Sequence, residues 1–256
     1  MIKTSIYFGL ALLSLIVLSN SGGGKEVKKA AKDKPIVVLT FDDSVASHAT
    51  FVAPLLKTYG FGATFFITEG FQFVIDKKNY MTWEQIQVLD AAGFEIGNHT
   101  KQHSRVGGQT LEQLTGDIAY IEEQCKTYGI PHPTSFCYPA YQTSETATKV
   151  LQERGYRFAR AGGARAFDPE TDDPLAMPQA FDGKPESTLE QFKAAVAMAR
   201  DGKIAIMTFH GVPDIKHPWV NTEPKKFKNY MEHLKKSGCR VISLRDLGIH
   251  LDEISR

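Results

Sequence analysis

The sequence predicts an α/β fold, a parallel sheet covered by helices that is either closed as a barrel or open. Short segments rich in β-branched and aromatic residues alternate about seven times with segments of helical periodicity, as in parallel sheets with helical crossovers. The chain has 256 residues, 42% hydrophobic and 23% charged, and can therefore bury a sizeable core. Polar residues follow several of the predicted strands, at the ends that converge on one mouth in a barrel of parallel strands.

Seven strands are predicted from apolar, β-branched segments bounded by Gly, Pro or polar residues. They cover residues 36–41, 63–67, 94–98, 135–138, 156–160, 204–208 and 240–243. Helices are predicted between them from apolar residues at helical spacing, with start signals such as Thr82 and stop signals such as Gly60. They cover residues 45–59, 82–92, 110–128, 145–154, 187–200 and 224–237, and a short helix follows the last strand. Residues 161–184 are predicted to form a loop.

The N-terminal segment has a different composition from the rest of the chain. A short positive start precedes an almost wholly apolar run over residues 6–18, and small residues and glycines follow, which is the layout of a secretory signal peptide. We predict a signal peptide over residues 1–22, a linker over 23–34 and one folded domain over 35–256. The protein is then exported, to the periplasm, the cell envelope or the medium. The alternative is an uncleaved N-terminal anchor, which would be its only contact with a membrane.

The charge and the cysteines exclude some classes of partner and site. With 30 basic and 29 acidic residues the formal net charge is +1, which argues against nucleic acid as a partner. The spacing of Cys125, Cys137 and Cys239 fits no zinc site, and an odd number cannot complete a disulfide framework. We interpret them as core thiols, although one disulfide bridge remains possible.

Two adjacent carboxylates, Asp42 and Asp43, follow the first predicted strand directly. Like charges this close are unfavourable unless a cation neutralises one of them. A metal ion bound by one acid would do so and would leave the other free as a base. The alternative is an Asp pair that caps the next helix.

Histidines follow two other predicted strands. His99 and His103 are four residues apart, so both imidazoles lie on one side if the backbone there enters a helical turn. Two histidines and one carboxylate form a common ligand set for a catalytic divalent metal, and Asp43 is the natural third ligand. Asp42 then remains free to take a proton from water that the metal acidifies. His210, after the sixth strand, is a candidate general acid or, alternatively, a core histidine; together these residues predict metal-assisted hydrolysis of an acyl or amide group.

These residues resemble the motifs of the polysaccharide deacetylase family, also called the NodB-homology family or carbohydrate esterase family 4. The first family motif, T-F-D-D-G, is matched by residues 40–44 with Ser44 in the Gly position. The second, H-[ST]-x-x-H, is matched in full by residues 99–103, and the late apolar strand ending in His is matched by residues 204–210. The resemblance covers about residues 35–247.

The resemblance implies a distorted (β/α) barrel of about seven parallel strands, related to the TIM barrel. Its implied activity is removal of N-acetyl, sometimes O-acetyl, groups from a polysaccharide or oligosaccharide with Zn²⁺ or another divalent metal such as Co²⁺, Ni²⁺ or Mn²⁺. It implies Asp42 as base, His210 as acid, and Asp43, His99 and His103 as metal ligands. The metal and a backbone N–H would share the charge of the tetrahedral oxyanion.

The third motif departs from the family pattern. The family has R-x-P-[YF], whose Arg orients the base, and this chain has Cys137 followed by Tyr138, Pro139 and Ala140. The pattern F-x-Y-P is similar to the branch that acts on poly-N-acetylglucosamine. Tyr138, Pro139 and Ala140 are candidates for binding the substrate or the oxyanion, the latter through the backbone N–H of Ala140. Arg160, at the end of the fifth strand, is a candidate to replace the missing cation near Asp42.

Further expectations concern the turn after the first strand and the rim of the site. Ser44 fits the Gly position provided that the turn needs no positive φ. Four aromatic residues of the mouth loops are candidates to stack on sugar rings. They are Tyr138, Tyr141, Phe181 and Trp219. Two other functions remain open, hydrolysis of a small cyclic amide and carbohydrate binding without catalysis. The predicted export argues against the first and the five intact core residues against the second.

Overall fold

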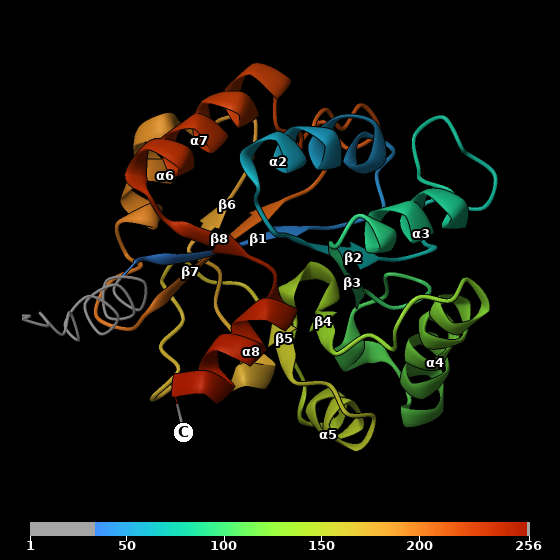
Figure 1. The fold of residues 1–256 in the computed structure, drawn as a ribbon. Coiled ribbons are helices and arrows are strands. Elements are labelled where there is room, and N and C mark those ends of the chain that lie inside the picture. Colours follow the sequence, from blue (N-terminus) through green and yellow to red (C-terminus); the bar gives the residue numbers. More distant parts are fainter. Residues whose placement is uncertain (1–33, 255–256) are drawn as a thin grey trace, which may run out of the picture. The chain divides into compact units, whose positions relative to one another are not determined.

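The computed structural model describes residues 34–254, and the chain from Pro35 onward forms one compact unit. Seven strands lie side by side in the order β5-β4-β3-β2-β1-β7-β6, and every pairing between them is parallel. The sheet curls into a half-barrel with helices around it (Figure 1), which confirms the predicted fold class. The predicted signal peptide lies outside the described residues. Within residues 34–254 no helix is long and apolar enough to cross a membrane.

The strands agree with the seven predicted segments, and one further strand is present. They are β1 Ile36–Phe41, β2 Thr64–Ile67, β3 Glu95–Asn98, β4 Ser135–Cys137, β5 Phe158–Arg160, β6 Phe181–Asp182, β7 Ile204–Phe209 and β8 Arg240–Ile242. The additional strand, β6, lies in the segment that was predicted to be a loop. Its two residues are too few to give a periodic signal, and pairing with β7 defines it.

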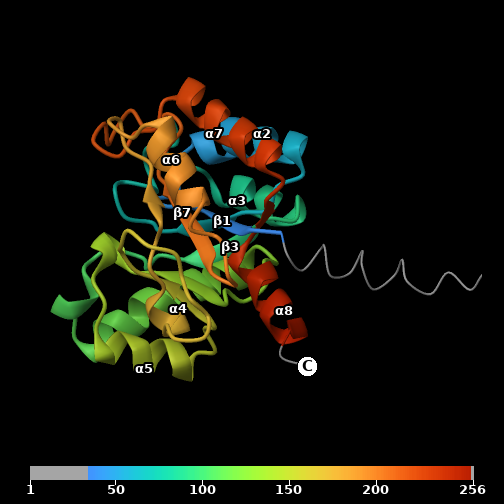
Figure 2. The same cartoon turned by 90° about the vertical axis from the view of Figure 1, so that its left-hand side faces the viewer.

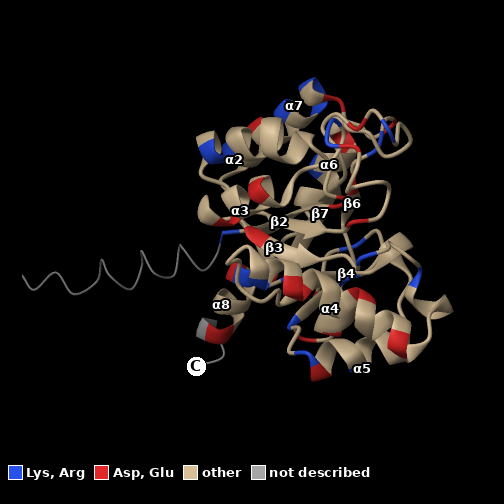
Figure 3. Ribbon diagram, turned by 90° about the vertical axis from the view of Figure 1, so that its right-hand side faces the viewer, with Lys and Arg blue, Asp and Glu red and all other residues tan. Residues whose placement is uncertain are grey.

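Helices cover both sides of the curled sheet. They are α2 Ala53–Tyr59, α3 Trp83–Ala91, α4 Leu111–Thr127, α5 Glu145–Glu153, α6 Leu189–Val196, α7 Pro224–Ser237 and α8 Leu244–Ile254. A π-helical turn, η1 His48–Val52, precedes α2, and short 3₁₀ turns cover η2 Val106–Gly108, η3 Pro139–Tyr141 and η4 Pro174–Ala176. Helices α2, α6 and α7 lie on one side of the strands, and α4 and α5 on the other (Figure 2). Basic and acidic residues are interspersed along the helices in the view of Figure 3.

Strand β1 is the centre of the sheet, and all six of its residues are buried. Along one edge it pairs with β7 over its full length. Along the other edge β8 pairs with its first half and β2 with its last two residues. An all-apolar strand of this kind is typical of a parallel sheet covered on both faces.

A buried carboxylate closes the N-terminal end of the half-barrel. Glu95 accepts hydrogen bonds from the hydroxyls of Thr64 (2.7 Å) and Ser135 (2.6 Å) and from the backbone N–H of Arg245 (2.7 Å), at the start of α8. These bonds join β2, β3 and β4 to the last helix. The residues of the sequence motifs stand at the opposite end, where β1, β3 and β7 finish.

The segment between residues 177 and 183 connects the two outer strands. Met177 exchanges backbone hydrogen bonds with Ala159 and Ala161 beside β5, each 2.8 Å long. Ala180 and Gly183 then donate to Ile206 and Thr208 of β7, again at 2.8 Å. The segment therefore narrows the opening between the outer strands and brings β6 to the edge of the site.

Candidate active site

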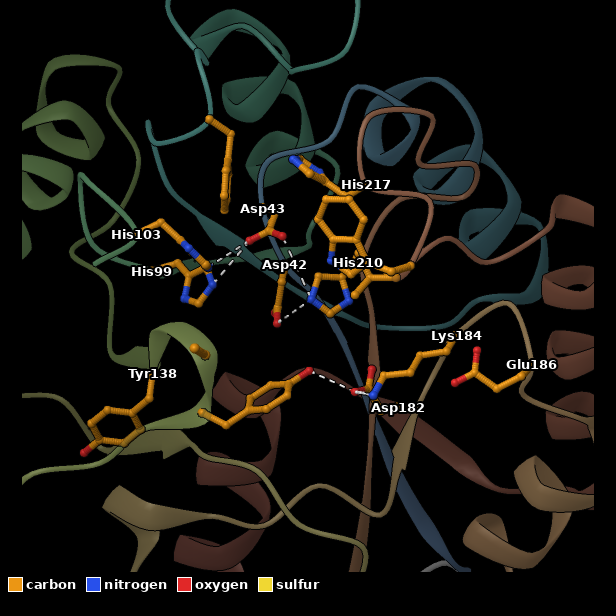
Figure 4. Close-up of a pocket in the computed structure, with 15 residues that line it drawn as sticks. Asp42, Asp43, His99, His103, Tyr138, Asp182, Lys184, Glu186, His210 and His217 are labelled. Atoms are coloured by element: carbon orange, nitrogen blue, oxygen red, sulfur yellow. Dashed lines mark hydrogen bonds and ion pairs between the residues drawn. The ribbon is translucent and has the colours of Figure 1, made fainter. Parts of the chain in front are cut away.

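A pocket of about 510 Å³ opens at the C-terminal ends of the strands. The structure brings together in it the five core residues that the sequence pointed to. Asp42 and Asp43 follow β1, His99 and His103 follow β3, and His210 follows β7, and all five side chains lie together in the pocket (Figure 4). The convergence of parallel strands thus joins residues that are up to 168 positions apart in the chain.

The turn that carries the two carboxylates has a left-handed backbone. Asp43 has φ 72° and Ser44 has φ 55°, so the condition that the turn needs no positive φ is not met. Ser44 is fully buried, and its hydroxyl donates to the carbonyl of Thr68 (2.8 Å) and accepts from the N–H of Thr68 (2.9 Å). Two hydrogen bonds that glycine could not make therefore hold the strained conformation.

The loop of residues 99–103 is not the helical turn that the spacing suggested. Thr100 has φ 63° and His103 has φ 55°, and the side chain of Asn98 accepts from the N–H of Thr100 (2.9 Å). This irregular loop still brings the two imidazoles together, with ring centroids 4.7 Å apart. The Nε2 atoms of His99 and His103 lie 3.4 and 3.3 Å from Oδ1 of Asp43.

A backbone carbonyl fixes the orientation of His99. Its Nδ1 lies 2.8 Å from the carbonyl oxygen of Cys137, which can only accept, so Nδ1 carries the hydrogen. The other nitrogen, Nε2, faces Asp43 and is then free to bind a metal ion. A metal-binding histidine typically has its second nitrogen held in this way.

The cluster of Asp43, His99 and His103 fits a divalent metal ion. Their ligand atoms lie within 4.8 Å of one another, and Oδ1 of Asp43 is buried with no hydrogen bond from any described residue. Burial alone would raise the pKa of Asp43, but His99, His210 and His103 hold it well below its usual value. Burial and the charge of His99 lower the pKa of His103 to about 4. An ionised carboxylate and a neutral imidazole are the forms that bind metal.

The surroundings of His99 raise its pKa and so favour its protonated form. Burial disfavours its charged form, yet the Cys137 sulfur and the carboxylates of Asp43 and Asp42 raise its pKa well above the usual value. A divalent cation at Oδ1 of Asp43 would supply the same positive charge. Metal and proton therefore compete for this histidine.

Asp42 forms a buried ion pair with Arg160. The guanidinium of Arg160 forms an ion pair with Oδ2 of Asp42, and both side chains are almost completely buried. Arg160 also donates to Gln179 (3.0 Å) and lies 2.7 Å from the sulfur of Cys137. Burial would raise the pKa of Asp42, but Arg160, with His99 and His210, lowers it. Arg160 therefore lies beneath Asp42, not in the open pocket where a substrate residue would lie.

A second group of residues could also offer ligands to a metal, but Arg160 contacts it. Asp42, His99 and Cys137 offer ligand atoms within 4.8 Å of one another. The guanidinium of Arg160 contacts both Asp42 and Cys137, so a protein cation already balances this group. Cys125 and Cys137 are buried, and all three cysteines, each in the described part of the chain, are free thiols.

His210 faces both carboxylates from the opposite side of the pocket. Its Nε2 lies 3.9 Å from Oδ2 of Asp42 and 3.9 Å from Oδ2 of Asp43. Its Nδ1 and the Oδ1 of Asp182 are buried atoms without a hydrogen-bond partner among the described residues. Figure 4 shows Asp182 below His210 on the same side of the pocket. Asp182 was missed in the sequence because it stands in a segment without periodicity.

The remaining sequence candidates lie at different depths. The ring of Tyr138 is fully buried and its hydroxyl donates to the carbonyl of Leu175 (2.8 Å), so it points away from the cavity. Pro139 is buried beside it, and Ala140 is exposed in the pocket wall with φ 51°. Trp219 is 66% exposed at the rim. The expectation that Phe181 lies at the mouth is wrong, because it packs in the core.

The pocket mouth has two chemically different sides. On one side the hydroxyl of Tyr141 donates to Asp182 (3.1 Å), which also pairs with Lys184 (3.2 Å). On the other side the ring of His217 lies 4.9 Å from that of Phe71 and 5.4 Å from that of Trp219. Of these, only Tyr141 and Trp219 were candidates from the sequence. The others carry no motif, and only the folded loops place them at the site.

His48 supports the site and gives the fold a dependence on pH. Its Nε2 lies 3.0 Å from the carbonyl of His210, and burial lowers its pKa from 6.5 to about 4. Below pH 6.5 the His48 of the unfolded chain binds a proton that the folded protein excludes, so the contribution of His48 to stability is complete above pH 6.5 and is lost toward pH 4. We expect the free energy of unfolding to fall by up to about 3 kcal/mol over this range.

Urea unfolding between neutral and mildly acidic pH tests this expectation. His48→Gln retains a donor for the carbonyl of His210 and removes the titrating group, so its stability is expected to vary less with pH. His132→Gln, at an exposed position, is the matched control and should behave as the wild type. Equal pH dependence in His48→Gln and wild type would contradict the assignment.

Comparison with known proteins identifies the family of this chain. The family model described as "Polysaccharide deacetylase" matches residues 29–159, about half of the chain. The chain belongs to the polysaccharide deacetylase family. A peptidoglycan-N-acetylglucosamine deacetylase of Bacillus cereus is 28% identical over 126 residues, which are 49% of this chain and 55% of that protein. The chain spans about half the length of the curated polysaccharide deacetylase relatives it matches.

Solved structures show the same deacetylase fold. A family 4 acetyl xylan esterase from Clostridium thermocellum, in complex with a cobalt ion, aligns with a TM-score of 0.58 and 24% identity over 83% of this chain and 89% of that one. A family pseudoenzyme from Bacillus anthracis aligns with a TM-score of 0.57 and 14% identity over 84% of this chain and 66% of that one. At these identities the likeness extends to the fold alone.

Proposed function

We propose that this protein is a metal-dependent hydrolase that removes N-acetyl or O-acetyl groups from an extracellular or cell-envelope polysaccharide. The observation that carries the proposal is the arrangement around Asp43. Oδ1 of Asp43 faces two imidazoles, while Asp42 and His210 stand beside the cluster within 3.9 Å of each other. A ligand set thus lies next to a separate base and a separate acid, as hydrolysis of an amide requires.

The metal is held by Asp43, His99 and His103 in this proposal. We take it to be Zn²⁺ or another divalent ion, which supplies Lewis-acid activation of water and of the acetyl carbonyl when bound. Asp42 accepts a proton from the attacking water, because Arg160 keeps its carboxylate ionised at neutral pH. His210, on the opposite side, gives a proton from Nε2 to the departing nitrogen or oxygen.

The walls of the pocket hold the sugar chain. Trp219, exposed at the rim, offers a face on which a sugar ring can stack. The backbone N–H of Ala140 remains our candidate for the oxyanion, since that role needs no side chain. Tyr138 and Pro139 support the backbone of this wall from behind. We also retain the N-terminal segment as a signal peptide, which would place the protein where such polysaccharides occur.

Acetate release from a panel of glycans tests the proposal. The purified protein is incubated with chitin oligomers, peptidoglycan, poly-N-acetylglucosamine and acetylated xylan, with added zinc and with a chelator. We expect release from at least one glycan, its loss with the chelator and its return when zinc is restored. Zinc bound at one equivalent without release from any glycan would favour a binding protein or a hydrolase of small cyclic amides. No zinc binding would contradict the ligand assignment.

A further inference from the structure

The loop between β2 and α3 separates the carboxylate turn from the histidine loop. Thr68 is bonded through both its backbone groups to the hydroxyl of Ser44, beside Asp43. On its other side, the N–H of Glu69 donates to the carbonyl of Lys101 (3.1 Å), and the hydroxyl of Thr68 donates to the same oxygen (3.3 Å). The two halves of the metal cluster are therefore linked through residues 68–69.

The same loop packs directly against His103. A Cβ at Gly70 would lie 3.0 Å from the Cβ of His103, so a larger residue there would have to displace His103 by a few tenths of an ångström. The ring of Phe71, which follows with φ 57°, lies 4.4 Å from that of His103. A shift of this loop by a fraction of an ångström would consequently move the imidazole of His103 relative to Asp43.

Glu69 fixes this loop to two helices. One carboxylate oxygen accepts from the indole N–H of Trp83 in α3 (2.6 Å), and the other accepts from the hydroxyl of Tyr120 in α4 (2.9 Å). The ammonium of Lys101 lies 4.1 Å from the centre of the Tyr120 ring, which ties the histidine loop to the same tyrosine. Hydrogen bonds to an ionised carboxylate are among the stronger ones in proteins, so Glu69 is the anchor of the loop.

We propose that Glu69 is a positioning residue that sets the affinity of the Asp43, His99 and His103 site for a divalent metal. The inference rests on the metal site of the proposed function. Glu69 does not touch the ligands; it acts through the loop that packs against His103. Outer groups that orient metal ligands typically change metal affinity by about 10- to 100-fold when they are lost.

The test measures zinc affinity of the full chain, with zinc chloride as the probe and a competing chromophoric chelator as the indicator. Glu69→Gln keeps the size of the side chain but has only one acceptor oxygen for two donors, and we expect the Kd for zinc to rise about tenfold. Tyr120→Phe removes one of the two bonds and should raise the Kd by a smaller factor. Urea unfolding of the metal-free proteins gives the accompanying change in stability.

A matched control separates positioning from general loss of stability. Asp172 accepts two hydrogen bonds from Arg165 and one from the N–H of Asp168. Asp168 directly follows Phe167, which pairs with Ile204 at the start of β7, at the end of the barrel away from the site. Asp172→Asn should cost stability and leave the Kd for zinc unchanged.

Each outcome bears on the proposal. A wild-type Kd in Glu69→Gln, or an equal rise of the Kd in Asp172→Asn, would overturn the positioning role while the metal site stands. If Glu69→Gln fails to fold, an unchanged Kd in Tyr120→Phe overturns it. A wild-type protein that binds no zinc would overturn the metal site and this inference together.

Discussion

Asp42→Asn is expected to lower the rate of acetate release by about a hundred- to ten-thousandfold, the usual contribution of a general base. The amide cannot accept the proton of the attacking water, although it has nearly the shape of the carboxylate. Metal binding should remain, because Asp43, His99 and His103 are unchanged. The measurements are kcat on the best glycan of the panel and the zinc content of the purified variant.

The control for this prediction is another carboxylate of the same pocket. Glu186 lines the pocket at an exposed position, and Glu186→Gln should keep most of the activity. If Asp42→Asn keeps kcat near the wild-type value, another group takes the proton, and Asp182, the remaining carboxylate on the same side as His210, becomes the candidate.

Arg160→Met is expected to destabilise the protein by about 3 to 5 kcal/mol, because it leaves the carboxylate of Asp42 buried without its partner. Both side chains are almost fully buried, so water cannot replace the guanidinium. The pKa of Asp42 should rise, since Arg160 is the first of the groups that lower it. Activity at neutral pH should fall because the base is then less ionised. Urea unfolding and the pH dependence of kcat measure the two effects.

The double variant Asp42→Asn/Arg160→Met isolates the pair. Removing both charges leaves no unpaired ion. The sum of the two single losses of stability should therefore exceed the loss in the double variant by about 2 kcal/mol or more. Arg157→Met is the control, because Arg157 pairs with Asp252 at an exposed position and such a pair contributes at most about 1 kcal/mol. Strictly additive losses would show that Arg160 is not the partner that Asp42 needs.

The sequence was informative where residues act locally. A clear apolar pattern marks the strands that precede Asp42, His99 and His210. Thr82 and Thr110 form the capping boxes that begin α3 and α4. Strand ends and caps depend on a few neighbouring residues. The fold class and the grouping of the five core residues could therefore be predicted.

The sequence was less informative where the site depends on contacts across the fold. The turn at Ser44 is left-handed because hydrogen bonds to Thr68 hold it there, and no local pattern announces them. Asp182 reaches the pocket only because two residues of a long irregular segment pair with β7. Tyr138 lies in the motif region, yet the carbonyl of Leu175 draws its hydroxyl away from the cavity. Such long-range contacts have no periodic signal in the chain.

The central position of β1 has a consequence for how the chain folds. Its full-length partner, β7, begins 168 residues later, and β8 pairs with its first half from still farther along the chain. The earliest part of the domain to be synthesised therefore has most of its hydrogen-bonding neighbours at the opposite end of the sequence. Contacts so distant require large loops to close before they stabilise anything, which slows folding. Assembly of the barrel, and with it of the Asp42–Asp43 turn, must therefore wait until nearly the whole polypeptide is available.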